Sequence, residues 1–495
     1  MQFHASTQQN QQAENILIPI PQTDNLSADL TAFLAQYNLK AEKLLQDFKA
    51  NAKDLQVFYT EKSRIYFLGL GKEPTFKDLL KIARSFFFNQ KNKIKNSLWI
   101  DAQHLTIDQI DGLFNGMLLS QYFLAIYKTD NQNKDTTFGF DTLALEIAVK
   151  PELLEAVHQV WHKNVIIAEI QRQMMDLVNL PPNKKPPKLL ANWARQSAQK
   201  YDYHVHILDK RDLENQRFDA LLAVAQGSQE PPFLIVTEHK PRNPLLKVGF
   251  VGKGITFDTG GLSIKESAGM YYMKSDMSGA ASVLGTVELA ARLNLPFHVI
   301  GVIPTAENSI DAKSFKPSDI IGSYLGKTIE IVDTDAEGRL ILADGIAYLN
   351  RTFQPDILID IATLTGNCIA ALGYEAAGLF TNNPELAQAL LKAGEQTGER
   401  LWQLPLWDSY KDEILSDMAD LKNYNGKPYA GAITAAKFLE VFTENHPKYA
   451  HLDIAGVAFG DSEFAKSKIA TAFGIRLFYQ FLLNLQMSLQ PNATP

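Results

Sequence analysis

The most informative segment of this sequence is Ile331-Val332-Asp333-Thr334-Asp335-Ala336-Glu337-Gly338-Arg339-Leu340. It places three acidic side chains and an arginine between an apolar run of strand type, Ile329–Val332, and one of helix type, Leu340–Leu349. Side chains two positions apart in an extended chain face the same way, so we expect Asp335 and Glu337 to converge. Charge clusters are usually solvated turns, but the buried-type sequence on both flanks predicts a site at the carboxyl end of a strand.

Strand and helix patterns alternate along the chain beyond residue 185. Short apolar runs of strand length occur at Val248–Val251, His298–Val302 and Ile357–Ile361. Longer helical patterns occur at Ala280–Leu293 and Leu386–Gly394. This alternation predicts an α/β catalytic domain over residues 185–495, with helices on the faces of a mostly parallel central sheet.

A smaller α/β domain is predicted over residues 1–150. Ile65–Gly71 and Leu98–Ile100 are typical of buried strands, and Leu79–Phe87 has helical spacing. Thr129–Thr137 is predicted to be a polar loop. This part of the chain contains no recognisable chemical motif.

A long helix is predicted to join the two domains. The helical pattern begins near Pro151 and ends at Pro181 and Pro182, because a proline cannot continue a helix. Lys184–Pro187 follows as a hinge-like stretch. We therefore assign residues 151–184 to a connecting helix and hinge.

A glycine-rich segment, Gly252–Gly261, follows the predicted strand at Val248–Val251. Its spacing matches neither a Walker phosphate loop nor the dinucleotide-binding fingerprint. It places Lys253 and Asp258 near the end of a parallel strand, where α/β enzymes bind ligands. A glycine-rich turn with a surface lysine is the alternative interpretation, and the segment alone does not decide between the two.

Asp276 precedes the predicted helix at Ala280–Leu293, which is rich in small residues. Capping a helix is the common role of an aspartate in this position, although Ser278 is equally able to cap. A helix of small apolar residues predicts burial. An aspartate at its mouth would then lose its water unless a cation paired with it.

Together the three segments supply one lysine and four candidate ligand carboxylates: Lys253, Asp258, Asp276, Asp335 and Glu337. Clustered carboxylates ionise together only when cations neutralise them. Oxygen ligands suit divalent ions, and a metal pair roughly 3.5–4 Å apart turns a bridging water into a nucleophile near neutral pH. Arg339 would steady an anion or orient the acceptor of the water's proton.

Other side chains that could take part in catalysis are better explained by structural or solvent-exposed roles. His158 and His162 have the spacing of a zinc-protease pair, but Gln159 stands where the required glutamate would be, so we interpret them as a solvated or interdomain pair. The same interpretation applies to His204 and His206 on a predicted strand. Cys368 lies in an apolar setting and is interpreted as an inert buried thiol.

Composition excludes several classes of protein. The chain of 495 residues has a formal net charge of −7, which argues against general binding to nucleic acid or an anionic membrane. With one cysteine, no intrachain disulfide framework is possible, which favours a reducing compartment. No membrane-spanning run and no export signal are evident, so we expect a cytoplasmic protein.

These segments closely resemble the leucyl aminopeptidase (cytosol aminopeptidase) family of di-zinc exopeptidases. The resemblance rests first on Asp333–Leu340, the signature of that family, with the glycine segment, Lys265 and Asp276 in the same order. It extends to three more motifs: Asp360–Gly366, Gly431–Ala436 and His451–Gly456. It runs from about Met175 to Phe478, whereas the first 150 residues resemble the family only faintly.

The resemblance implies a role for each matching residue. One zinc would be held by Lys253, Asp258, Asp276 and Glu337. The other would be held by Asp258, Glu337 and both the side chain and backbone carbonyl of Asp335. Lys253 would then have to bind as a neutral amine, with a depressed pKa. Lys265 would polarise the scissile carbonyl, and Arg339 would hold a bicarbonate that acts as general base.

The resemblance also implies a pocket for the substrate's first side chain, lined by Met273, Thr363, Gly366, Ala455 and Ala458. Family members often carry methionine where Ala458 stands, so we expect a wider pocket floor. Asp333 replaces a more usual asparagine, and Ser278 stands where cysteine or glycine is common. Neither is an expected metal ligand.

The expected activity is removal of an amino-terminal residue, preferably Leu or another apolar one, from peptides. The expected cofactors are two divalent ions per chain, Zn²⁺ or Mn²⁺, and the expected assembly is a homohexamer. Two competing hypotheses are a DNA-binding regulator and a catalytically inactive homologue. The mild negative charge disfavours the first, and the intact set of site residues disfavours the second.

Overall fold

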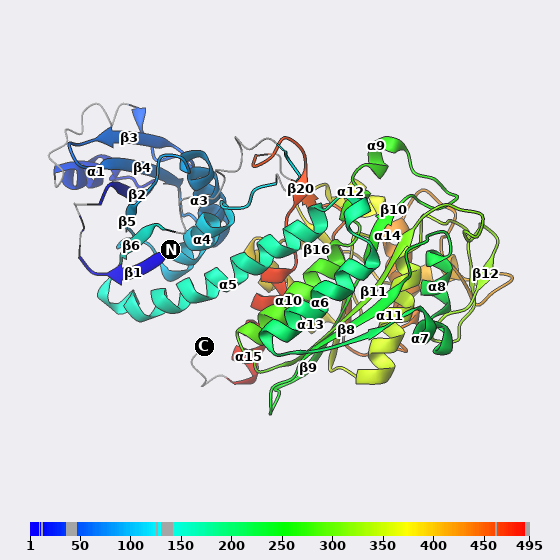
Figure 1. The fold of residues 1–495 in the computed structure, drawn as a ribbon. Coiled ribbons are helices and arrows are strands. Elements are labelled where there is room, and N and C mark those ends of the chain that lie inside the picture. The colour runs from blue at the N-terminus through cyan, green and yellow to red at the C-terminus, as the bar shows by residue number, and fades with distance from the viewer. Residues whose placement is uncertain are drawn as a thin grey trace. The chain divides into compact units, whose positions relative to one another are not determined.

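The structure is a computed structural model that describes residues 1–8, 10, 13–35, 47–124, 127–129, 142–460 and 463–490. The chain divides into two compact units, Met1–Glu169 and Ile170–Pro495 (Figure 1). The division falls within the long helix α5 (Leu154–Asn179), which the short η2 (Pro151–Leu153) precedes. The domain limits at residues 150 and 184 stay a prediction, and the polar loop predicted at Thr129–Thr137 falls largely outside the described residues.

The described part of the first unit contains a six-stranded sheet in the order β1-β6-β5-β2-β4-β3. Only the β3–β4 pairing is antiparallel. The strands are β1 (Gln2–Ser6), β2 (Asn15–Pro21), β3 (Leu55–Tyr59), β4 (Arg64–Gly71), β5 (Ser97–Asp101) and β6 (Ala144–Ala148).

Helices cover both faces of this sheet, and the alternation of side chains along β4 shows why. Tyr66 and Leu68 point into one apolar core, together with residues of α3 (Phe76–Gln90) and α4 (Ile107–Leu119). Ile65 and Phe67 point into a second core with residues of α1 (Leu26–Ala35). Because successive side chains of a strand point to opposite faces of the sheet, this one strand contributes residues to both cores.

The second unit is built on a larger sheet, with nine strands among its described residues. Eight follow the order β16-β15-β18-β14-β9-β11-β8-β7, and β10 pairs with β11. The central strands β18, β14, β9 and β11 are parallel, as predicted, whereas β7, β8 and β15 introduce antiparallel pairings. The strands are β7 (His204–Leu208), β8 (Phe233–His239), β9 (Lys247–Gly252), β10 (Gly254–Asp258), β11 (His298–Asn308), β14 (Ile357–Ala362), β15 (Ala377–Thr381), β16 (Leu401–Gln403) and β18 (Tyr449–Asp453).

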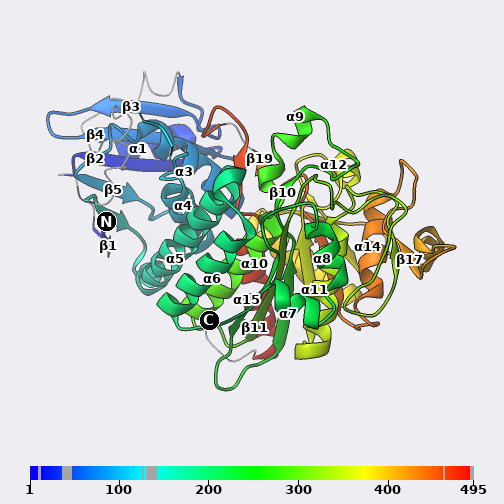
Figure 2. The same ribbon diagram turned by 45° about the vertical axis from the view of Figure 1, so that its right-hand side comes forward.

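Two helical layers sandwich this sheet (Figures 1 and 2). One layer contains α6 (Pro187–Tyr201), α10 (Ser278–Arg292), α13 (Pro384–Thr397) and α15 (Ile475–Leu489). The other contains α8 (Asp219–Ala225), α11 (Gly338–Phe353), α12 (Gly366–Leu372) and α14 (Gly431–Val441). The predicted α/β class with a mostly parallel central sheet is confirmed.

The strand predicted at Ile329–Val332 is shorter than expected and lies elsewhere. Only β13 (Ile329–Glu330) forms, in a separate three-stranded sheet with β12 (Ile320–Ile321) and β17 (Leu421–Lys422). The apolar character of the segment reflects burial, since Ile329 and Ile331 are both in the apolar core, and burial alone does not specify a strand of the main sheet.

The remaining short elements connect these layers. They are α7 (Lys210–Asn215), α9 (Ser267–Met270), β19 (Phe459–Gly460), β20 (Ile469–Ala470), and the 3₁₀ turns η3 (Pro182–Lys184), η4 (Met273–Ser275) and η5 (Asp408–Ile414). Among the described residues, no helix is both long enough and apolar enough to cross a membrane.

Candidate active site

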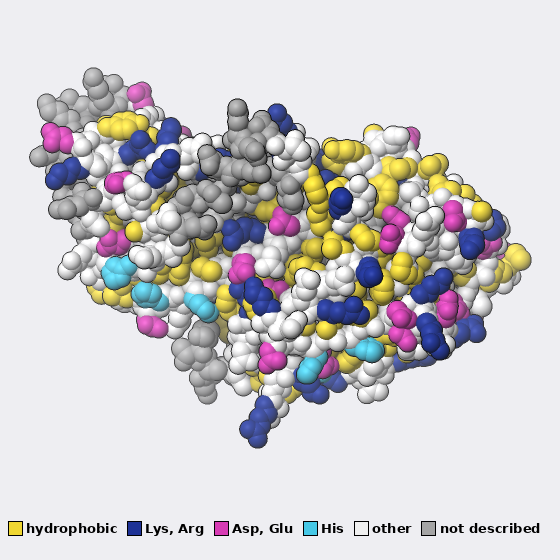
Figure 3. Space-filling view, viewed as in Figure 1, with side chains coloured by type: hydrophobic (Ala, Val, Ile, Leu, Met, Phe, Trp, Pro, Cys, Tyr) yellow, Lys and Arg dark blue, Asp and Glu magenta, His cyan; other side chains and the backbone are white. Residues whose placement is uncertain are grey.

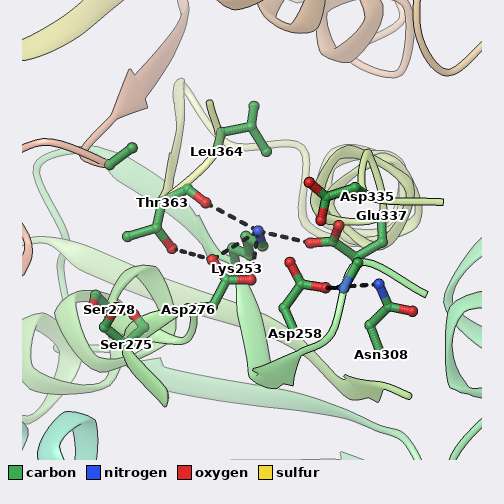
Figure 4. A network of polar contacts seen from close by, with 12 residues as sticks. Lys253, Asp258, Ser275, Asp276, Ser278, Asn308, Asp335, Glu337, Thr363 and Leu364 are labelled. Atoms are coloured by element: carbon green, nitrogen blue, oxygen red, sulfur yellow. Dashed lines mark hydrogen bonds and ion pairs between the residues drawn. The ribbon is translucent and has the colours of Figure 1, made fainter. Parts of the chain in front are cut away.

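Five acidic or basic side chains from distant parts of the second unit meet beside the carboxyl ends of its parallel strands. Lys253 follows β9 directly, and Asp258 is the last residue of β10. Asp276 precedes α10, and Glu337 immediately precedes α11. Figure 4 shows Asp335 beside Glu337, with the carboxylates gathered around Lys253.

Lys253 lies at the centre of this cluster and is fully buried. Its Nζ atom is 2.9 Å from Asp276 Oδ1 and 2.9 Å from Glu337 Oε1, and it donates to the backbone oxygen of Thr363 at 3.0 Å. The hydroxyl of Thr363 donates to Asp276 Oδ1 at 2.8 Å. Thr363, which follows β14, therefore fixes both Lys253 and Asp276.

A second lysine contacts the other side of the cluster. Lys265 Nζ is 2.9 Å from Asp258 Oδ2 and also forms an ion pair with Asp335 Oδ1. Asp258 Oδ1 accepts from the backbone N–H of Gly260 and from Asn308 Nδ2, both at 2.8 Å. The Lys265 side chain is 19% exposed, so it is not fully enclosed by the cluster.

Two glycines are required by the close packing here. A Cβ atom on Gly338 would lie 2.6 Å from Lys253 Nζ, so any side chain at this position would displace the lysine. Gly260 has a φ of +84°, which favours glycine, and a Cβ there would lie 2.9 Å from Asp335 Oδ1. The glycines of both sequence motifs therefore make room for the charged groups.

Three of the carboxylates, those of Asp276, Asp335 and Glu337, have raised pKa values. Burial raises the pKa of Asp276 to about 8, with the charges of Asp258 and Glu337 adding to the shift. Burial also raises the pKa of Asp335 to about 7, again with Glu337 and Asp258 contributing. Burial, together with the charge of Asp258, also raises the pKa of Glu337. The mutual repulsion that the sequence predicted is thus present.

The cluster has the chemistry of a metal site. Carboxylate oxygens of Asp258, Asp335 and Glu337 lie within 4.8 Å of one another. Both oxygens of Glu337 and one each of Asp276 and Asp335 are buried without a partner of hydrogen-bond geometry, although lysine Nζ atoms lie within ion-pair distance. Unsatisfied buried oxygens of this kind fit divalent cations, which take hard oxygen ligands.

The protonation of Lys253 differs from the expectation for a ligating amine. Burial alone lowers the pKa of this lysine, but Asp276, Glu337 and Asp258 outweigh burial and raise it above its ordinary value. Without further cations, the ammonium group is what balances these carboxylates. A depressed pKa requires that other positive charges take over this role.

Asp335 and Glu337 come together in a different way from the one predicted. Asp335 lies in a turn, and Glu337 has the helical backbone angles φ −76° and ψ −34°. Alternation along an extended strand is therefore the wrong reason for their proximity. The backbone N–H of Asp335 donates to Asp333 Oδ1 at 2.8 Å, which stabilises the turn.

Arg339 lies in the first turn of α11 and is buried. Its Nη1 donates to the backbone oxygen of Asn423 at 2.7 Å, and its Nε is buried without a hydrogen-bond partner in the described structure. Burial lowers the pKa of Arg339 to about 10, with Glu337 and Asp333 opposing. The side chain therefore retains a donor for an anion.

Sequence reasoning missed two asparagines that support the site. Asn308 orients Asp258, as described above, and also donates to the backbone oxygen of Thr334 at 3.2 Å. Asn423 accepts from the backbone N–H of Val332 at 2.7 Å and donates to the backbone oxygen of Asp333 at 2.6 Å. A single asparagine in a loop carries no spacing signal, so only the tertiary contacts reveal these roles.

The residues expected to line the substrate pocket are held by two loops that share one buried aspartate. Asp453 Oδ1 accepts from the backbone N–H groups of Thr365 and Ala455, at 3.4 and 3.1 Å, which brings the segments of Gly366 and Ala455 together. Thr363 touches Asp276, as described above. Met273 opens η4, and Ala458 is buried, with only 2% of its surface exposed.

The side chains that the sequence set aside are not among the residues of this cluster. His158 and His162 are exposed on α5, and His204 and His206 are exposed on β7. Burial raises the pKa of the Cys368 thiol to about 12, as expected for an inert thiol. On the face shown in Figure 3, basic and acidic side chains are interspersed, without a large basic block.

Comparison with known proteins agrees with this arrangement. A model of the cytosol aminopeptidase family, catalytic domain, matches residues 172–479. The chain therefore belongs to the cytosol aminopeptidase family, and it is a hydrolase of the metallo-exopeptidase class.

Particular relatives cover most of the chain. It is 40% identical to a probable cytosol aminopeptidase of Chlorobium limicola over 460 residues, 89% of this chain and 91% of the relative. It is 45% identical to a probable cytosol aminopeptidase of Geobacter sp. over 369 residues, 74% of each chain. Its fold is similar to that of the bottromycin maturation enzyme BotP in complex with Mn, with a TM-score of 0.83, 28% identity, and coverage of 96% of this chain and 99% of that one.

Proposed function

We propose that this protein removes amino-terminal residues, preferably Leu or other apolar ones, from peptides by means of two divalent metal ions. The observation that carries the proposal is the cluster of four carboxylates, in which four oxygens, belonging to Asp276, Asp335 and Glu337, are buried without a hydrogen-bond partner. One ion would be held by Lys253, Asp258, Asp276 and Glu337. The other would be held by Asp258, Asp335 and Glu337. When bound, such ions activate water and polarise a carbonyl group.

The protein's own groups supply the rest of the proposed chemistry. Lys265 is partly exposed beside Asp258 and Asp335, so its ammonium group is positioned to hold the oxygen of the scissile carbonyl. Arg339 has a free buried donor, which supports its proposed role of holding bicarbonate as a proton acceptor. The loops joined by Asp453 would hold the substrate's first side chain, against Met273, Thr363, Gly366, Ala455 and Ala458.

The identity of the metals, the assembly and the location remain proposals of the same kind. Zn²⁺ and Mn²⁺ both accept these ligands, and the similar structure of BotP was solved with Mn. We further propose a homohexamer, as the family resemblance implies, and a cytoplasmic location, in keeping with the relatives described as probable cytosol aminopeptidases.

Metal analysis combined with an activity assay tests the proposal. We expect two divalent ions per chain, hydrolysis of Leu-p-nitroanilide, loss of hydrolysis after chelation and recovery when Zn²⁺ or Mn²⁺ is restored. Acetyl-Leu-p-nitroanilide is the matched control, because blocking the amine should prevent hydrolysis by an exopeptidase. Equal hydrolysis of both substrates, or activity that survives metal removal, would contradict the proposal.

A further inference from the structure

Lys185 is a buried lysine that the proposed chemistry does not use. It follows η3, in the stretch that the sequence marks only as hinge-like, and its side chain is 0% exposed. Among the described residues, no carboxylate lies within ion-pair distance of its Nζ. A buried ammonium group without a carboxylate partner costs free energy, so its presence calls for a specific role.

The contacts of Lys185 join two segments that are distant in sequence. Its Nζ donates to the backbone oxygen of Val178, in the last turn of α5, at 2.9 Å. It also donates to the backbone oxygen of Lys274, the middle residue of η4. The ammonium group therefore tethers η4 to the end of α5.

The tether matters because η4 leads directly into the carboxylate cluster. The backbone N–H of Asp276 donates to the backbone oxygen of Met273 at 3.2 Å, and the hydroxyl of Ser278 donates to the backbone oxygen of Ser275 at 2.6 Å. These bonds fix η4 onto α10 from within the same segment. Lys185 instead holds the Lys274 carbonyl from outside it, and so sets where this segment lies.

We propose that Lys185 is a positioning residue that, through η4, holds the carboxylate of Asp276 where a metal ion can bind it. This inference rests on the proposed two-metal function. Because the same turn begins at Met273, the tether also positions one wall of the substrate pocket. Lys185 touches neither metal nor substrate.

The charge of Lys185 acts in the opposite direction from its tether, which makes the proposal testable. Burial and the nearby Lys274 lower the pKa of Lys185, whereas Asp276 opposes them. A positive charge on Lys185 would disfavour a cation bound at Asp276. If charge were its main contribution, removing it would tighten metal binding; if tethering dominates, removing it weakens metal binding.

The experiment compares Lys185→Met with Lys184→Met, which removes the exposed neighbouring lysine. Each metal-free protein is titrated with Mn²⁺, and free Mn²⁺ is followed by electron paramagnetic resonance. We expect Lys185→Met to raise the Kd of at least one site by about 10–100-fold, the usual effect of removing a group that orients a ligand. Lys184→Met should match the wild type.

A stability measurement separates positioning from general damage. Replacing a buried charge with an apolar side chain of similar volume is often neutral or stabilising, so the Tm of metal-free Lys185→Met should equal or exceed that of the wild type. At saturating Mn²⁺, kcat for Leu-p-nitroanilide should recover more fully than KM, because Met273 remains displaced.

The outcomes distinguish this inference from the proposed function. If the wild type binds two Mn²⁺ ions and hydrolyses the substrate while Lys185→Met binds Mn²⁺ as tightly or more tightly, the role of Lys185 is overturned and the proposed function stands. If the wild type binds no divalent ion, both fall. If Lys185→Met does not fold, Lys185→Gln, which keeps a neutral N–H donor, should show a smaller loss of affinity, and an unchanged Kd would refute the tether.

Discussion

The two units of this protein are built in the same way, but they differ in the number of charged side chains that they bury. Each has a sheet with parallel central strands and helices on both faces. Among the described residues of the first unit, Asp101 is the only buried acidic or basic side chain, histidine aside. In the second unit the buried charged side chains are Lys185, Lys253, Asp258, Asp276, Glu288, Glu337, Arg339, Asp344, Asp360, Glu399, Lys437 and Asp453.

A parallel sheet therefore provides a place for an active site, whereas the buried charged residues provide its chemistry. Burying a charge is unfavourable unless a partner or a ligand compensates. Four of these charged side chains, Lys253, Asp258, Asp276 and Glu337, lie together beside the carboxyl ends of parallel strands of the second unit, and the family match falls on that unit. The buried residues of the first unit are mainly apolar side chains that form its two cores.

The largest effect is expected from Asp335→Asn, which removes one charge from the proposed pair of metal sites. We expect kcat to fall by about 10³-fold or more, together with a loss of bound metal that high metal concentration partly restores. Metal content by mass spectrometry and kcat against metal concentration check this. Two tightly bound ions per chain in the variant would refute the assignment of Asp335.

Lys265→Ala should have the next largest effect. Loss of an electrostatic or acid–base group usually lowers kcat by roughly 10²–10⁴-fold. Metal content and Tm should barely move, because Lys265 is not a proposed ligand and its side chain is partly exposed. Lys316→Ala, which changes an exposed lysine, is the control, and near-native turnover of Lys265→Ala would remove it from the mechanism.

Ala458→Met should produce a smaller and selective change. If Ala458 widens the pocket floor, methionine should depress hydrolysis of Phe and Met anilides relative to Leu, by about tenfold for two methylenes at about 0.8 kcal/mol each. The alternative is that Phe459, which is buried next to Ala458 in the chain, already fills the pocket floor, so that the substrate preference does not change. A uniform change in kcat/KM across the three anilides would show that this position does not set the preference.

The smallest effect on activity is expected from a large-to-small substitution in the core of the first unit. Leu113→Ala, in α4, removes a fully buried side chain and should destabilise that unit by about 2–5 kcal/mol. We expect faster hydrogen exchange in β4 and α4 but unchanged kcat/KM. The matched variant Leu340→Ala, next to Arg339, should lower activity. An equal loss of activity in both variants would break the contrast between the units.

Much of the fold was predictable because periodicity reports burial directly. The helices at Ala280–Leu293 and Leu386–Gly394 and the strands at Val248–Val251 and Ile357–Ile361 are all present, with limits shifted by a few residues. The prediction failed at Ile329–Val332, where an apolar run is buried in a small separate sheet. Apolar character says that a segment is buried and does not say against what.

The class of fold, the residue types of the site and the family to which they point could all be inferred from local sequence patterns. Glycine spacing and clustered acidic residues are local features, so they can be recognised in the sequence alone. The tertiary structure alone decided how those acids meet: a turn, and not an extended strand, brings Asp335 to Glu337. It also decided which distant side chains support them, namely Asn308, Asn423 and Lys185. Such contacts join segments far apart in the chain, and a lone asparagine or lysine looks the same in sequence whether it is solvated or buried.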